Sequence, residues 1–150
     1  MQSGRLSTSS LLQRLFKTNH IGRFIKHFDD QLEYVPFSAY ISKLCADRGA
    51  SPAQIIRKSG IERTFGHQLF SGKRTPSRDK VIQIAFGFGM NYDETQELLK
   101  ISRKSLLYPK VKRDAVVIYA LTRGLGVMEV QATLDELSLP LLGKEERRYE

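Results

Sequence analysis

The chain has 150 residues, 41% of them hydrophobic, which suits one ordinary domain or a small domain with extensions. Its 24 Lys and Arg against 16 Asp and Glu give a net charge of +8, which favours polyanionic partners such as nucleic acid. The one cysteine, Cys45, excludes an internal disulfide framework, and without an apolar run of secretory or membrane-spanning length we expect a cytoplasmic protein with no membrane association.

Residues 1–35 are predicted to form an N-terminal mobile segment followed by amphipathic helices. The Ser-rich stretch 1–10 carries few apolar groups, so we expect it to be mobile. Beyond it, apolar residues recur at intervals of three and four, which is helical spacing. The pattern predicts one helix over residues 9–17 and a second over residues 20–32, before the extended Val35-Pro36 pair.

Residues 36–106 are predicted to form a domain of five helices, starting at Phe37 and ending at Ile101. The first ends at Gly49, a residue suited to the left-handed conformation. The second begins at Ser51-Pro52-Ala53-Gln54, where serine is a helix cap, proline takes the first position and glutamine completes a capping box. It ends at Gly60, so it has only about two turns.

The third helix of this domain is predicted from Glu62 to Phe70, with Ile61 filling the turn before it. The fourth follows a cap at Ser77, and the fifth a cap at Asn91. Residues 107–150 are predicted to form a C-terminal helical pair, ended by Pro140, and a charged tail. No segment alternates with a period of two, so the predicted fold class is all-α.

The spacing of the second and third helices resembles the phage repressor and Cro type of helix-turn-helix protein, the XRE family. The similarity covers residues 37–101, and its specific elements are the Ser51 cap, the Gly60-Ile61 turn, the inward Leu69 and the exit from Gly72 to Ser77. It implies a five-helix lambda-repressor-like domain, with N-terminal and C-terminal helical extensions, that binds double-stranded DNA and regulates transcription, most often as a repressor.

The resemblance also implies which residues contact DNA. Arg63, Thr64 and Gln68 match the base-contacting positions, and His67 is a further candidate. Arginine pairs well with guanine and glutamine with adenine in the major groove. Phosphate contacts are expected from Gln54, Ser71, Lys73 and Arg74, and also from Arg78 and Lys80 at the start of the fourth helix. For Arg78 an ion pair with Asp79 or Glu62 is the alternative.

The family's repressors bind as homodimers, and we expect residues 114–142 to supply the dimer surface. Packing of that pair within one chain is the alternative. A second basic run either flanks the DNA or is a solvated linker: Lys100, Arg103, Lys104, Lys110, Lys112 and Arg113.

Another hypothesis is a protein-binding adaptor or antitoxin-like partner that uses the same fold, with a protein partner held by the third helix or the terminal helices. Pro52 and Gly66 support it, because the family has a glutamine and a branched apolar residue there. We expect Phe65 to fill the space beside Gly66. The histidines are scattered, Cys45 lies on an apolar helical face and no phosphate loop or metal set is recognisable, so we expect no enzyme and no cofactor.

Overall fold

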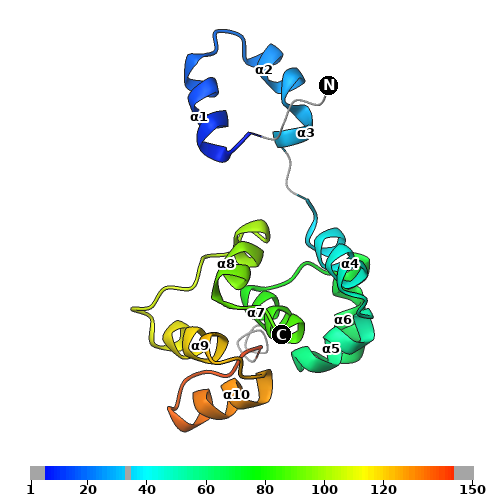
Figure 1. The fold of residues 1–150 in the computed structure, drawn as a ribbon, viewed down its shortest axis with the longest axis vertical. Coiled ribbons are helices and arrows are strands. Elements are labelled where there is room, and N and C mark those ends of the chain that lie inside the picture. The colour runs from blue at the N-terminus through cyan, green and yellow to red at the C-terminus, as the bar shows by residue number, and fades with distance from the viewer. Residues whose placement is uncertain (1–5, 33–34, 144–150) are drawn as a thin grey trace. The chain divides into compact units, whose positions relative to one another are not determined.

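The computed structural model describes residues 6–32 and 35–143, which form ten helices and no strand (Figure 1). The all-α prediction is therefore confirmed for this part of the chain. The chain divides into two compact units, Met1–Val35 and Pro36–Glu150. None of the helices in the described ranges is long and apolar enough to cross a membrane.

The first unit contains α1 (Thr8–Lys17), α2 (Ile21–His27) and α3 (Asp29–Leu32). The prediction of one helix over residues 20–32 is wrong, because the backbone leaves the helical conformation at Phe28 (φ −107°, ψ 17°). Asp29 and Asp30 follow, and they occupy the first turn of α3, where acidic side chains interact favourably with the helix dipole. In the predicted mobile stretch, residues 8–10 belong to α1, and residues 1–5 lie outside the described residues.

The second unit contains α4 (Phe37–Arg48), α5 (Pro52–Ser59), α6 (Arg63–Ser71), α7 (Arg78–Phe88), α8 (Tyr92–Ile101), α9 (Lys112–Thr122) and α10 (Val127–Glu136). The predicted caps are confirmed. Ser51 Oγ accepts from the Gln54 amide at 3.2 Å while Gln54 Oε1 accepts from the Ser51 amide at 3.0 Å, and Asn91 forms the same reciprocal pair with Glu94. Gly49 and Gly60 end their helices at φ 63° and 68°.

Helix α7 is the centre of the second unit and lies between α5 on one side and α8 and α10 on the other (Figure 1). Its residues from Val81 to Phe88 are all buried. Gly87 permits the close approach of α5, since a Cβ there would overlap Ser59 Oγ and lie 2.7 Å from the Ile55 carbonyl oxygen. The position of α5 is therefore determined by its contact with the buried part of α7.

Two crossed ion pairs join the start of α7 to the start of α9. Arg78 donates to both carboxylate oxygens of Asp114, at 3.0 and 2.8 Å, and Arg113 donates to both oxygens of Asp79, at 2.8 Å each. The two carboxylates are 6% and 7% exposed. Each helix therefore supplies one arginine and the adjoining aspartate, and the bidentate geometry aligns the two helix starts.

The same four side chains also hold the segments that flank α9 and α10. Arg78 donates to the carbonyls of residues 105 and 106, and Arg113 to those of residues 140 and 141. Asp114 accepts from the amide of residue 108, and Asp79 from that of residue 143. The alternative pairing of Arg78 with Asp79 or Glu62 is wrong, because Arg78 pairs with Asp114 of α9 while Asp79 pairs with Arg113.

The C-terminal helices bury part of their apolar side chains within their own chain. Val117 and Leu121 of α9 and Val130 and Leu134 of α10 are buried, and the two helices contact each other, α8 and α7. The helical pair was predicted to end at Pro140, but α10 ends at Glu136, Leu137 after it is exposed, and Ser138 adopts a left-handed φ of 57°. Residues 144–150 of the predicted tail lie outside the described residues.

Candidate nucleic-acid interface

Helices α5 and α6 are joined by a short turn of Gly60, Ile61 and Glu62. Ile61 is buried beneath the turn, as predicted. Glu62 caps α6, since its carboxylate accepts from the Phe65 amide at 2.7 Å. Hydrogen bonds from the backbone amides of Phe65 and Thr64 lower the pKa of the Glu62 carboxyl. The acidic side chain is therefore directed at the amides of its own helix.

Gly66 of α6 packs against Ile56 of α5. A Cβ at this position would come within 2.5 Å of Ile56 Cγ2, so the isoleucine of α5 occupies the space that a side chain on α6 would need. The expectation that Phe65 fills this space is wrong. Phe65 is half-buried and faces cationic side chains instead. The glycine is thus a packing requirement of the two-helix unit.

The predicted base-contacting residues share the outer side of α6. Arg63, Thr64 and His67 are exposed, and Gln68 is half-exposed. Arg63 and His67 border a hollow of about 510 Å³ that lies against α5. The described residues that line this hollow include no carboxylate. The structure therefore brings the polar candidates of α6 together on one accessible surface.

Arg57 also lines this hollow, and it was missed in the sequence. It is an exposed cation in the last turn of α5, one helical turn after Ala53, which lines the same hollow. One feature of the sequence indicated this position: Ala53 and Arg57 are four residues apart, which places both on the same face of α5. Arg57 thus adds a second arginine beside Arg63.

The Phe65 ring in the first turn of α6 contacts two cations that follow this helix in the sequence. Arg74 lies over the ring at 4.8 Å and Lys80 at 5.1 Å from its centroid. Arg74 Nε also donates to Gln68 Oε1 at 2.6 Å. The ring therefore supports two cations, and one of them orients the Gln68 amide.

The remaining phosphate candidates differ in how much of their hydrogen-bonding capacity the fold uses. Gln54 is exposed, and its amide oxygen is engaged in the α5 cap, so its amide NH₂ group is the part that projects. Ser71 Oγ donates to the Gln68 carbonyl at 3.2 Å. Lys73 is exposed. A neutral donor is therefore exposed at the start of α5, and a cation is exposed after the end of α6.

Arg78 differs from the other candidates, because its guanidinium is committed to Asp114 and to the carbonyls of residues 105 and 106. Arg113 of the second basic run is committed in the same way to Asp79. These two arginines align α7 with α9. Lys100, Lys110 and Lys112 are exposed.

Other kinds of site find little support in the described ranges. No three His, Cys, Asp or Glu side chains gather there in an arrangement that could hold a metal ion. Cys45 is 3% exposed, and burial raises the pKa of its thiol, which suits a packed cysteine.

Comparison of the chain with protein-family models, curated proteins and solved structures finds no match. The functional interpretation therefore depends on the geometry of α5, α6 and the turn that follows them.

Proposed function

We propose that this protein is a sequence-specific DNA-binding regulator, in which α5 and α6 form a helix-turn-helix within a five-helix lambda-repressor-like domain. The observation that carries the proposal is the surface of α6, which exposes Arg63, Thr64 and His67, borders a hollow whose described lining has no carboxylate, and carries two cations on the Phe65 ring. Polar donors that converge on one face of a short helix are what major-groove recognition requires.

In this proposal α6 enters the major groove with its N-terminal residues toward the base edges. Arg63 occupies the first position of the helix, where its guanidinium can donate twice to guanine O6 and N7. Gln68 lies more than one turn further along, and Arg74 holds its amide in a defined direction. The Gln68 amide is thus oriented before DNA arrives, which reduces the entropy that this side chain loses on binding.

Phosphate contacts in this proposal come from both ends of the helix-turn-helix. Gln54 keeps its amide NH₂ group available at the start of α5, while Ser71 ends α6, Lys73 and Arg74 follow it, and Lys80 lies over the Phe65 ring. These contacts fix the register of the protein on the duplex without specifying sequence. We leave Arg78 out of the set, since Asp114 and two carbonyls already use its donors.

Replacing Arg63 with alanine is expected to weaken binding to the preferred sequence by about 1 to 3 kcal/mol, because a bidentate arginine contact contributes that much discrimination. The variant should lose its preference for a particular base at one base pair and keep its preferences at the others. The measurement is fluorescence anisotropy on duplexes that differ only at that base pair, with a sequence first obtained by selection from a random library.

Arg123→Ala is the matched control for this substitution. It removes the same charge from an exposed arginine at the end of α9, where the guanidinium lies 3.8 Å from the Tyr119 ring centroid. We expect it to leave the sequence preference unchanged. If Arg63→Ala changed the affinity for all duplexes equally, the assignment of Arg63 as a base contact would be wrong.

A protein-binding adaptor is the second candidate function, and exposed apolar side chains at the C-terminal helices favour it. Met128 of α10 is 86% exposed and Leu137 is 57% exposed, although the rest of the helical pair is packed on α7 and α8. The same surface is available for the homodimer that the resemblance implies. Recovery of one stoichiometric protein partner, without enrichment of any DNA sequence, would favour the adaptor.

A further inference from the structure

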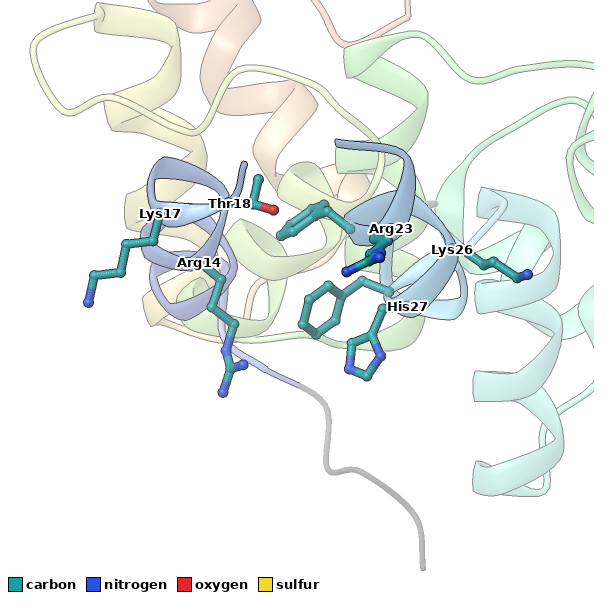
Figure 2. A pocket seen from close by; sticks show the side chains of 8 residues that line it. Arg14, Lys17, Thr18, Arg23, Lys26 and His27 are labelled. Carbon is teal, nitrogen blue, oxygen red and sulfur yellow. The ribbon is translucent and has the colours of Figure 1, made fainter. Parts of the chain in front are cut away.

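The N-terminal unit contains an open groove of about 790 Å³ between α1 and α2 (Figure 2). Phe24 and Phe28 line it, each 7% exposed, with ring centroids 4.9 Å apart. These rings are the main buried side chains of the unit. The groove is therefore built on the small apolar core of the unit.

Basic side chains from both helices border the groove. Arg14 and Lys17 come from α1, and Arg23, Lys26 and His27 come from α2 (Figure 2). All are exposed, and the structure assigns them no ion-pair partner among the described residues. Arg14 instead lies 5.9 Å from the Phe28 ring centroid. No Asp or Glu precedes Asp29 in the sequence, so the positive charge is concentrated in α1 and α2, and the acidic residues Asp29 and Asp30 follow it at the start of α3.

Charge complementarity makes a polyanion the expected ligand of this groove, because the described residues that line it include two arginines, two lysines and no carboxylate. Leu12 and Leu15 of α1 are exposed as well. At 100° per residue, however, Arg14 lies about 200° from Leu12 and Lys17 about 200° from Leu15 around the helix. The cations therefore face away from the exposed leucines and toward the groove, where a chain of phosphates can lie.

We infer that this groove binds the phosphodiester backbone of duplex DNA and so forms a second, sequence-independent contact in addition to that of the proposed helix-turn-helix. The choice of DNA over other polyanions rests on the proposed function. Because the two units belong to one chain, binding by one raises the effective concentration of the other at the same duplex. The groove should therefore add affinity and salt dependence without adding sequence preference.

The test compares the full-length chain with the double variant Arg14→Gln, Lys17→Gln on two duplexes, the selected sequence and a mixed sequence. Each lost phosphate contact reduces the slope of log binding constant against log salt by about 0.9, so we expect the slope to shrink by about 2 on both duplexes. The sequence preference should not change. Circular dichroism checks that the helices are retained.

The control variant Lys43→Gln, Arg123→Gln removes the same net charge from exposed positions outside the groove. An equal fall in slope for this control, or an unchanged slope for the groove variant, would overturn the inference. Sedimentation with phosphatidylserine vesicles that depends on Arg14 and Lys17, with an unchanged DNA slope, would assign the groove to lipid instead. The mixed-sequence duplex tests the groove even if the chain selects no sequence, which separates this inference from the proposed function.

Discussion

Asp79→Ala is expected to lower the free energy of unfolding by about 3 to 5 kcal/mol, because it leaves the Arg113 guanidinium buried without its carboxylate. That guanidinium is 12% exposed and donates to both oxygens of Asp79, and Asp79 also accepts from the amide of residue 143. Loss of the Asp79–Arg113 ion pair should separate α9 and the C-terminal segment from α7. Since the chain has no tryptophan, urea unfolding is best followed by circular dichroism.

Asp47→Ala is the matched control, because it breaks the Lys43–Asp47 pair, whose side chains are 76% and 57% exposed. Exposed pairs contribute only about 0 to 1 kcal/mol, so little change is expected. Adding Arg113→Met to Asp79→Ala should restore part of the loss, since it removes the unpaired charge. Equal effects of Asp79→Ala and Asp47→Ala would show that the crossed pairs do not stabilise the unit.

Gly87→Ala is expected to destabilise the second unit by about 3 kcal/mol, at the upper end of ordinary overpacking costs. The new methyl group would meet Ser59 Oγ and the Ile55 carbonyl oxygen, and the backbone atom cannot move aside by a rotamer change. Helix α5 would be displaced from α7. Urea unfolding measures the stability, and a variant that still folds should bind the selected duplex more weakly.

Gly22→Ala provides the comparison for Gly87, because a Cβ at Gly22 in α2 would meet nothing within 4 Å. Alanine is favoured over glycine inside a helix, so no loss of stability is expected there. Ser59→Ala in the Gly87→Ala background should recover only the part of the loss caused by the serine hydroxyl. Full recovery would mean that the α5 backbone is not the limiting contact.

Local sequence signals were sufficient to predict the limits of the central helices. The Ser51–Gln54 and Asn91–Glu94 capping boxes each join residues three apart in the sequence. The glycines that end helices adopt the left-handed conformation themselves: Gly49, Gly60 and Gly89. Both signals can therefore be recognised in a short stretch of sequence. The break at Phe28 was missed because an apolar residue at helical spacing concealed it.

The contacts between residues far apart in the sequence could not be predicted from local sequence signals. The partners of Arg78 and Arg113 lie 36 and 34 residues away in sequence, and nothing local distinguishes them from exposed arginines. Ile56 of α5 fills the space at Gly66, and the Phe65 ring instead contacts Arg74 and Lys80. For the candidate site, the sequence indicated which residues share the outer face of α6, but not that Arg57 borders the same hollow.

Selection from a random-sequence duplex library with the purified full-length chain tests the proposed function most directly. The account predicts enrichment of one motif, strong weakening of its binding as salt rises, and loss of preference at one base pair in Arg63→Ala. A library that stays unenriched, or a motif that Arg63→Ala selects unchanged, would contradict the claim that α6 reads DNA sequence.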